Sequence, residues 1–208
     1  MDKVDFKKTL KHLYNPPKKN FVIIEVPKMN FLMIDGQGDP NTSMAYQQAL
    51  ETLYPMAFGI KFASKKSLGR DYTVPPLEGL WWAEDMDVFT TSTSKDAWLW
   101  TMMIMVPEWI DQALVEATRE SVADSKDVPV IDRLRFEAYD EGLSVQIMHV
   151  GSFDDEAPTI HRLHNEFLPL ENLMENGKHH EIYLSDPRRV APEKLRTVLR
   201  QPVKPIAN

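Results

Sequence analysis

Apolar positions along the chain occur in the same order twice. In Phe21–Ile60, and again in Leu134–Met174, two apolar strand-like runs lead to a glycine and then to a helix with an apolar stripe. Gly38 and Gly151 lie 113 residues apart, and the stripes lie 114 apart. This repeat predicts two similar halves related by pseudo-symmetry, with a groove between them as a natural ligand site. The stripes are Tyr46, Ala49, Leu53, Met56, Ile60 and Ile160, Leu163, Phe167, Leu170, Met174.

The pattern also predicts the individual elements. Each half begins with a hairpin, and the first long helix is capped by Thr42 or Ser43. A helix over Glu108–Ala123 has the stripe Trp109, Ile110, Ala113, Leu114, Ala117 and Pro107 at its start, and the second half has a helix of about Ala157–Asn176. The predicted hairpins are Phe21–Val26 with Phe31–Gly36, and Arg133–Tyr139 with Leu143–Gly151; further strands are Tyr72–Glu84, Trp98–Val106, His180–Leu184 and Leu195–Val203.

These elements predict an α+β fold, with helices packed on one face of antiparallel sheet. We expect an N-terminal helical extension over residues 1–20 and one domain over residues 21–208. The domain is made of two similar modules, at about 21–124 and 130–204, with a groove between them. Asp124–Pro129 is the predicted boundary between the modules.

The run Trp98–Val106 is apolar on both alternating faces, unlike an antiparallel strand with one wet face. Both faces are therefore expected to be covered, one by helices and the other by the partner half or by a ligand. Large flat or flexible side chains such as Trp100 and Met102 suit contact with a hydrophobic ligand. Plain core packing is the alternative for each residue.

Composition narrows the function. The 208 residues carry a net charge of −7 with no basic block, which argues against a nucleic-acid partner. Cys is absent, so disulfides, thiolate nucleophiles and Cys-type zinc sites are excluded. The N-terminus lacks an apolar signal segment, and no apolar run is long enough for a membrane span. We therefore expect a cytoplasmic protein, monomeric or weakly dimeric, without a cofactor.

Several stretches resemble the GyrI-like small-molecule-binding family, whose domain also serves as the effector-binding module of some transcription activators. They are the glycine-to-helix steps at Gly38 and Gly151, the run Val74–Trp82, and the runs His179–Arg189 and Leu195–Val203. The resemblance covers about Phe21–Val203 and implies a stand-alone form. It also implies the family fold, a pair of strand–helix–strand–strand modules whose sheets form a central ligand cleft, with the helices on the opposite face. One stand-alone branch, which the double tryptophan and the run from Glu181 to Arg188 resemble, adds water to the cyclopropane ring of cyclopropanoid DNA-alkylating toxins.

One departure concerns the final strand. Cation-sensing relatives carry a glutamate there, whereas Leu195–Gln201 has no acid, which puts recognition of lipophilic cations in doubt. Glu181 on the preceding strand is the nearest candidate. Strand alternation places it on one face with His179 and Tyr183. A carboxylate drawn into an apolar cleft acts as a general base on water, and Tyr183 beside it donates a hydrogen bond to the ligand or holds that water. The alternative is a solvent-facing Glu181 paired with Arg188 or Arg189.

Other candidates would hold the ligand. Trp82 and Trp100 are expected to stack on a flat aromatic compound, assisted by Met102 and His179. Only one of Trp81 and Trp82 can face the cleft, and we predict Trp82. His149 would orient a polar ligand group, although a histidine satisfied by backbone is the plainer interpretation. His161 and His164 lack a third ligand at suitable spacing, so no metal site is expected.

The sequence therefore leaves three hypotheses. The leading one is a hydrolase in which Glu181 and Tyr183 act on a cyclopropanoid toxin bound in the inter-module cleft. The alternative is a drug-binding sponge or sensor without catalysis. A third is a protein that acts by contacting a larger protein, as the gyrase-inhibitor namesake does.

Overall fold

The computed structural model describes residues 3–83 and 95–206, and its fold is α+β, as predicted. The chain divides into two compact units. The first unit is Met1–Thr9 with Met29–Tyr139, and the second is Leu10–Lys28 with Asp140–Asn208. Glu84, the last residue of the predicted strand Tyr72–Glu84, lies outside the described residues.

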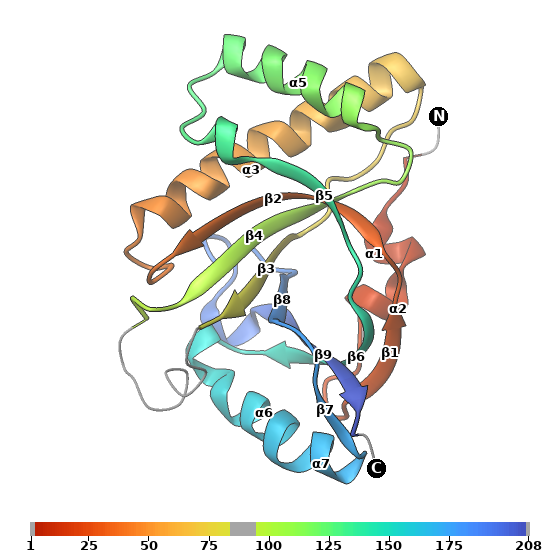
Figure 1. The fold of residues 1–208 in the computed structure, drawn as a ribbon, viewed down its shortest axis with the longest axis vertical. Coiled ribbons are helices and arrows are strands. Elements are labelled where there is room, and N and C mark those ends of the chain that lie inside the picture. Colours follow the sequence, from red (N-terminus) through yellow and green to blue (C-terminus); the bar gives the residue numbers. More distant parts are fainter. Residues whose placement is uncertain (1–2, 84–94, 207–208) are drawn as a thin grey trace. The chain divides into compact units, whose positions relative to one another are not determined.

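The first unit is an antiparallel sheet with helices on one face. Its strands are β2 (Met29–Gln37), β3 (Leu77–Trp82), β4 (Leu99–Val106) and β5 (Arg135–Tyr139), in the order β3-β4-β2-β5. Helix α3 (Met44–Ala63) lies along this sheet, and α5 (Gln112–Ser125) packs beside α3 (Figure 1). Ser43 caps α3 by accepting a hydrogen bond from the backbone N–H of Tyr46. The predicted stripe faces inward, with Ala49, Leu53, Met56 and Ile60 buried.

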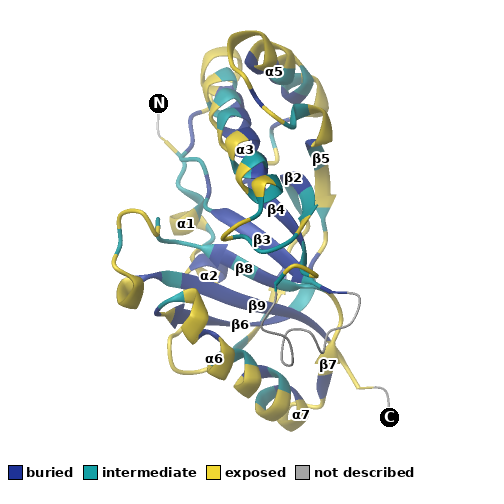
Figure 2. Ribbon diagram, turned by 90° about the vertical axis from the view of Figure 1, so that its left-hand side faces the viewer, coloured by how far each residue is buried: buried dark blue, intermediate teal, exposed yellow. Residues whose placement is uncertain are grey.

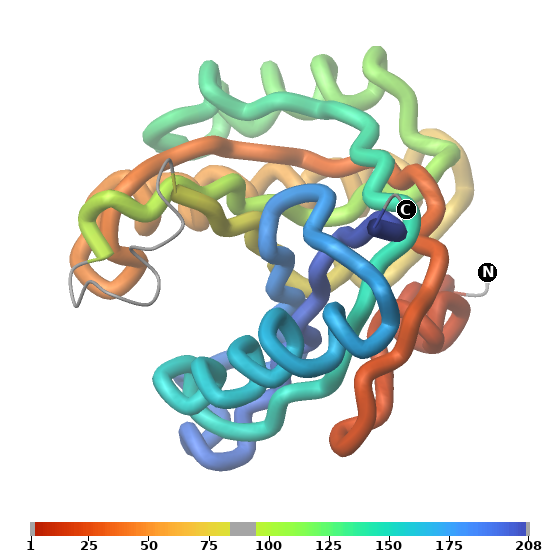
Figure 3. The backbone as a smooth tube through the Cα atoms, turned by 60° about the horizontal axis from the view of Figure 1, so that its bottom comes forward, coloured from red at the N-terminus to blue at the C-terminus, as the bar shows by residue number. Residues whose placement is uncertain are grey.

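The second unit repeats this plan. Its strands β1 (Val22–Val26), β6 (Gly142–Val150), β8 (His179–Tyr183) and β9 (Arg196–Pro205) form a sheet in the order β1-β6-β9-β8. The short strand β7 (Leu173–Glu175) also pairs with β9. Between β6 and β7 the chain forms η3 (Phe153–Asp155), α6 (Ala157–Arg162), a π-helical turn η4 (Leu163–Phe167) and α7 (Leu168–Leu170), which Figure 3 shows as one continuous helical run.

The N-terminal extension predicted for residues 1–20 contains two short helices. Helix α1 (Phe6–Thr9) belongs to the first unit and α2 (Lys11–Tyr14) to the second. Phe6 packs on Tyr72 and Trp109, whereas Leu13 and Tyr14 are buried. The extension predicted for residues 1–20 is therefore part of both units and not an appendage.

The predicted repeat is present at residue level. Strand β2 and strand β6 have bounds 113 residues apart and the same length. Each is followed by a glycine with positive φ, Gly38 at 104° and Gly151 at 151°. The order strand–helix–strand–strand, β2–α3–β3–β4, recurs as β6–helical run–β8–β9. The strand-to-glycine-to-helix step is thus confirmed as the unit of repetition.

Both predicted hairpins are wrong, because their strands pair elsewhere. Strand β1 pairs with β6, and β5 pairs with β2. A two-residue hairpin needs residues that adopt positive φ, and neither Pro27 nor Lys28 does. The chain therefore continues from β1 into β2 instead of folding back. Because β5 pairs with β2, the first unit extends to Tyr139, past the predicted boundary at Asp124–Pro129.

The second helical run ends earlier than predicted. The turn η4 takes one residue more per turn than an α-helix, which shifts the inward stripe from Phe167 to Leu168. Leu170 is consequently 76% exposed. Asn172 adopts a left-handed φ of 54°, and Met174 lies on β7. The stripe prediction therefore holds for Leu163 and fails for Leu170 and Met174.

Helix α5 also departs from its prediction. It begins after Asp111, whose carboxylate accepts a hydrogen bond from the N–H of Leu114, and not at Pro107. Its buried residues are Val115, Thr118 and Val122, so the predicted stripe was out of register. Strand β4 is confirmed and is buried along nearly its whole length. Elsewhere, residues 64–68 extend α3 as a π-helical turn. Among the described helices, none is long and apolar enough to cross a membrane.

Candidate functional site

Strand β8 brings three polar side chains together on one face. The Tyr183 hydroxyl donates a hydrogen bond to Oε2 of Glu181 at 2.8 Å. Nε2 of His179 lies 3.5 Å from Oε1 of the same carboxylate. The Glu181 side chain is only 15% exposed. The predicted sharing of a face by His179, Glu181 and Tyr183 is therefore observed, with the carboxylate between the other two.

The predicted alternative, a solvent-facing Glu181 paired with arginine, does not describe this strand. Arg188 and Arg189 form ion pairs with Asp186 in the following turn. Phe153 of η3 packs edge-on against the Tyr183 ring, with centroids 5.7 Å apart. The carboxylate thus sits in a mostly desolvated position beside an aromatic pair, where a hydrogen-bonded base is chemically useful.

Strand register extends this polar face across the sheet. Tyr183 lies opposite Thr197 of β9, and Thr197 lies opposite His149 of β6. Directly opposite residues of an antiparallel pair project to the same face, about 5 Å apart at Cβ. In the next row, Glu181 lies opposite Leu199, and Leu199 opposite Ile147. His149, Thr197, Tyr183 and Glu181 therefore form one continuous polar patch, which we call the β8–β9–β6 patch.

This patch lies on the face that the helical run covers. Val145, two residues along β6 from Ile147, clusters with Leu163 of η4 and Leu168 of α7. Alternation puts Val145, Ile147 and His149 on that same face. Figure 2 shows the buried strands β6 and β9 under α6 and α7, whose outer surfaces are exposed. The patch is therefore at the helix-bearing face of the second unit, and not at the face opposite the helices, where the cleft with Glu181 was predicted.

Two groups near the patch lack hydrogen-bond partners among the described residues. The hydroxyl of Thr197 is buried and unpaired, in a residue only 1% exposed. Both ring nitrogens of His179 are also buried without a hydrogen bond. Buried polar atoms are nearly always paired in native proteins, so each exception calls for an explanation. A polar ligand group or water is the explanation that a binding site supplies.

His149 already has a partner. Its Nε2 lies 3.0 Å from the backbone carbonyl of Ser152, so that nitrogen carries the hydrogen and donates. This is the backbone-satisfied histidine that the sequence analysis gave as the plainer interpretation. Its other ring nitrogen is an acceptor in the neutral form.

The opposite face of β8 has a different character. His180 and Ile182 are fully buried, and the Glu141 carboxylate accepts hydrogen bonds from Nδ1 of His180 at 2.8 Å and from Nη1 of Arg200 at 3.0 Å. Burial by itself would raise the pKa of Glu141, but the charges and hydrogen bonds of His180 and Arg200 lower it to about 2. The carboxylate is thus held ionised in the interior.

This network also fixes α2 to the sheet. Nη2 of Arg200 donates to the carbonyl of Leu13 at 2.9 Å, and Nε donates to Oε1 of Gln146 at 3.1 Å. Gln146 in turn donates to the carbonyl of His12 at 2.7 Å. Every group in the chain Glu141–Arg200–Gln146 has a partner, which is typical of a structural network.

The tryptophans of the first unit are divided between the two faces of its sheet. Trp81 lies opposite Trp100, and Trp100 opposite Gly36. Tyr46 of α3 stacks on Trp81 and meets Trp100 edge-on, so this row faces the helix. Trp82 is on the other face and is half-buried. Trp82 therefore projects to the face opposite the helix, where the ligand cleft was predicted, and Trp81 projects to the helix-bearing face.

Trp100 and Met102 are fully buried on this helix-bearing face. The Trp100 indole N–H donates to the carbonyl of Gly38 at 3.2 Å. A Cβ on Gly36 would lie 2.1 Å from the Trp100 ring, so the glycine makes room for it. Core packing, the alternative stated for both residues, accounts for these contacts.

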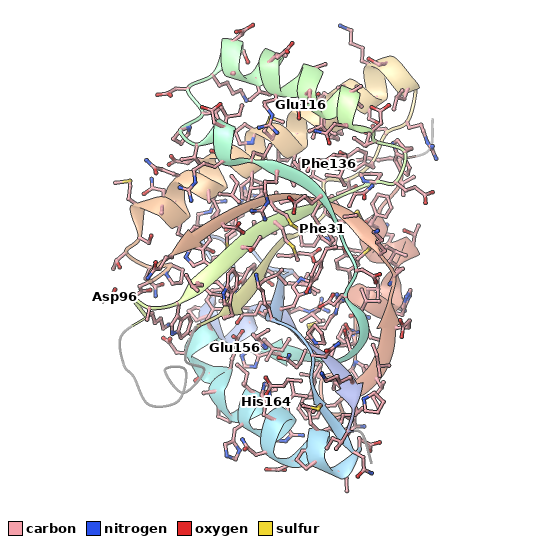
Figure 4. The ribbon with its side chains drawn as sticks, in the orientation of Figure 1. Phe31, Asp96, Glu116, Phe136, Glu156 and His164 are labelled. Carbon is pink, nitrogen blue, oxygen red and sulfur yellow. The ribbon has the colours of Figure 1, made fainter. Side chains whose placement is uncertain are left out.

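The remaining histidines do not form a cluster with the patch. His164, labelled in Figure 4 on the helical run, has Nδ1 2.6 Å from Oε1 of Glu175, and this pairing lowers the pKa of Glu175. In the part of the chain that the structure describes, no group of three or more acidic, histidine or cysteine residues is arranged to hold a metal ion.

Sequence reasoning missed two residues of interest, Thr197 and Trp81. Thr197 stands in an apolar strand, and only the pairing of β9 with both β6 and β8 reveals that it is flanked by His149 and Tyr183. For Trp81, the contact with Tyr46 of α3 identifies its face as the helix-bearing one. Neither the pairing partners nor this helix contact is visible in the local pattern.

Comparison with known proteins agrees with this architecture. The family model of the GyrI-like small molecule binding domain matches residues 19–204. The chain belongs to the GyrI-like family. The resemblance drawn from sequence is thereby confirmed, and the protein contains a small-molecule-binding domain over almost its whole length.

Solved structures include close relatives of this GyrI-like protein. An uncharacterized conserved protein from Listeria innocua is 42% identical, with a TM-score of 0.88 over 97% of this chain and 100% of that one. A hydrolase from Listeria innocua is 41% identical, with a TM-score of 0.83 over 97% and 100%. The C-terminal domain of EcmrR, 9% identical with a TM-score of 0.56 over 90% and 98%, shares the fold alone. The search of curated proteins finds no match.

Proposed function

We propose that this GyrI-like protein is a hydrolase that binds a flat hydrophobic compound and opens the cyclopropane ring of cyclopropanoid DNA-alkylating toxins by adding water. The observation that carries the proposal is the Glu181 carboxylate, mostly desolvated and hydrogen-bonded by Tyr183 at 2.8 Å. Relatives about 41% identical over their whole length are described as hydrolases. Detoxification is the biological role that this reaction would serve.

The chemistry needs few groups. A cyclopropane conjugated to a carbonyl is strained and electrophilic. In our proposal the oxygen of water bonds to a ring carbon, the strained carbon–carbon bond breaks, and its electron pair moves through the conjugated system to the carbonyl oxygen. Glu181 takes a proton from the water and returns it to that oxygen, so that atoms and charges balance. Tyr183 holds the carboxylate in position, as its hydrogen bond fixes Oε2.

The aromatic residues would hold the plane of the compound. Tyr46 and Trp81 stack with centroids 6.4 Å apart, and Trp98 meets Trp81 edge-on at 5.8 Å. Aromatic surfaces of this kind bind flat ligands by stacking. Because Trp81 projects to the helix-bearing face, we propose Trp81 as the aromatic contact in place of the predicted Trp82. His179, beside Glu181, would contact the bound ligand or its water.

The proposal is tested by identifying the product. The purified protein is incubated with a cyclopropanoid alkylator, and the compound is followed by mass spectrometry over time. We expect a product heavier by one water, formed with more than one turnover per protein. Unchanged compound together with quenched tryptophan fluorescence would instead establish the second candidate, a binding protein without catalysis, which the description of the family as small-molecule-binding favours.

A further inference from the structure

The two units carry equivalent rows of residues on their helix-bearing faces, with opposite chemistry. In the first unit the row is Gly36, Trp100 and Trp81. In the second it is His149, Thr197 and Tyr183. Gly36 and His149 are 113 residues apart, the offset of the repeat, and the central strand is β4 in one unit and β9 in the other. The two rows therefore occupy equivalent positions in the two sheets, as the strand register shows.

The first row belongs to the packed core between the sheet and α3. Trp100 is fully buried, lies directly over Gly36 and has its indole N–H bonded to the carbonyl of Gly38. Tyr46 of α3 covers it. The contacts of Gly36 and Trp100 explain their residue types, so both serve packing between sheet and helix.

The second row is polar where the first is aromatic. Threonine replaces the central tryptophan, and its buried hydroxyl has no hydrogen-bond partner among the described residues. Leaving a buried hydroxyl unpaired costs free energy, which a purely structural position avoids by using valine, a residue of the same shape. The hydroxyl therefore has a use in a state that contains a further polar group.

The neighbours of Thr197 indicate what that group is. Tyr183, directly opposite, uses its hydrogen to bond Glu181 and so presents only lone pairs to the row. His149 uses its Nε2 hydrogen for Ser152 and likewise presents an acceptor in its neutral form. Thr197 is then the member of the row whose hydrogen is free to donate to a ligand, and an oxygen acceptor is its natural partner.

We propose that Thr197 forms a subsite for a carbonyl or hydroxyl oxygen of the bound compound, a role that rests on the proposed function. Thr197 donates a hydrogen bond to the oxygen that is a carbonyl in the strained substrate and a hydroxyl in the ring-opened product. Where that oxygen carries a hydrogen, His149 accepts it. The substrates this subsite selects are cyclopropanoid compounds in which the carbonyl is present, and not hydrophobic compounds in general.

The test uses Thr197→Val, which removes the hydroxyl and keeps the shape, and Thr197→Ser, which keeps the hydroxyl. Thr101→Val is the matched control, because Thr101 is also a buried strand threonine but donates to Asp35 at 2.6 Å. Three quantities are measured: the Kd of the ring-opened product by tryptophan fluorescence, kcat/KM for the cyclopropanoid substrate, and the Tm.

We expect Thr197→Val to raise the Kd about tenfold and to leave the Tm unchanged or higher, because no protein hydrogen bond is lost. Thr197→Ser is expected to stay within about twofold of the wild-type Kd, since the donor remains. Thr101→Val is expected to lower the Tm and leave the Kd unchanged. A wild-type Kd in Thr197→Val overturns the subsite, most clearly if its Tm falls as far as that of Thr101→Val.

The two proposals fail in different ways. If the wild type binds the product in a Thr197-dependent manner but turns over no substrate, the subsite stands and hydrolysis is refuted. If turnover is normal and Thr197→Val changes neither Kd nor kcat/KM, hydrolysis stands and the subsite is refuted. A wild type that neither binds product nor consumes substrate overturns both.

Discussion

At the scale of single residues, alternation along β8 places the candidate catalytic side chains on one face of the sheet and the structural side chains on the other. Glu181 and Tyr183 project to the helix-bearing face, where the carboxylate has one hydrogen-bond donor and a histidine at 3.5 Å. His180 and Ile182 project to the other face, where His180 belongs to a fully paired buried network. Adjacent residues of one five-residue strand thus serve a candidate reaction and the stability of the fold.

Tyr183→Phe tests the support of the carboxylate. The variant removes the 2.8 Å hydrogen bond to Glu181 but keeps the ring that packs on Phe153. We expect kcat for ring opening to fall about tenfold, because a charge-assisted hydrogen bond orients the base, while KM changes little. Steady-state kinetics at one pH gives both constants. A variant with unchanged kcat would show that Tyr183 does not position Glu181.

The two adjacent tryptophans are distinguished by substitution. Trp81→Leu is expected to weaken binding of a flat cyclopropanoid compound by about tenfold, because it removes a ring that stacks on Tyr46 at the helix-bearing face. Trp82→Leu is the matched control on the opposite face and is expected to change the Kd by less than about twofold. Equilibrium binding by isothermal titration measures both. The reverse ranking would return the ligand contact to Trp82, as the sequence alone suggested.

At the scale of elements, the periodic pattern predicted what depends on local sequence. The glycine-terminated strands β2 and β6, the stripe of α3 and the doubly buried strand β4 follow from spacing and capping residues, and all are present. The pairing of β1 with β6 could not be read from the chain, because it depends on partners more than a hundred residues away. Likewise the π-helical turn η4 shifts its stripe through backbone geometry that residue types do not encode.

For the candidate site, too, the sequence predicted only the grouping that depends on a single strand. His179, Glu181 and Tyr183 could be grouped because they lie on one strand, where alternation is enough. Thr197 could not be added, since its neighbours come from β6 and β8. Trp100 and Met102 have the residue types of a ligand wall, but tertiary packing under α3 buries both.

Gly36→Ala tests the sheet–helix packing of the first unit. The new Cβ would lie 2.1 Å from the Trp100 ring, which is held from the other side by Tyr46. Overpacking of this kind costs about 1–3 kcal/mol, so we expect a clearly lower Tm. Adding Trp100→Leu should then cost less than it does in the wild type, because the clash is relieved. Urea unfolding of the four proteins measures this coupling, and strict additivity would contradict the packing described.

At the scale of the whole chain, a paired buried charge network supports the second unit. It joins α2, β6, β8 and β9 through Glu141, Arg200 and Gln146. Disrupting this network destabilises the fold strongly, because each remaining charge stays buried without its partner. Removing one partner of such a network destabilises a protein by about 3–5 kcal/mol.

Acid stability follows from Glu141. Its pKa in the folded protein, about 2, lies below the ordinary value of 4.5, so ionisation stabilises the fold above about pH 4.5 and this stabilisation is lost as the pH falls towards 2. We expect the free energy of unfolding to fall over that window, by on the order of 3 kcal/mol from this group. Urea unfolding between pH 2 and pH 7 measures the change.

Glu141→Gln is expected to be less stable at pH 7 and to lose much of this pH dependence. Glu137→Gln provides the control, because Glu137 is 53% exposed at the side chain and its ion pair with Arg135 should contribute at most about 1 kcal/mol. If both variants were equally stable at pH 7, the network would not have the structural role described.

The most direct test of the account compares single-turnover ring opening by the wild type and Glu181→Gln, with the protein in excess over a cyclopropanoid substrate. Glu175→Gln is the control, since Glu175 is a partly exposed acid of the same unit. The account predicts that Glu181→Gln slows ring opening about 100-fold or more while the Kd stays within a few-fold, and that Glu175→Gln opens the ring at close to the wild-type rate. A normal rate in Glu181→Gln would contradict the role of this carboxylate as the base that activates water.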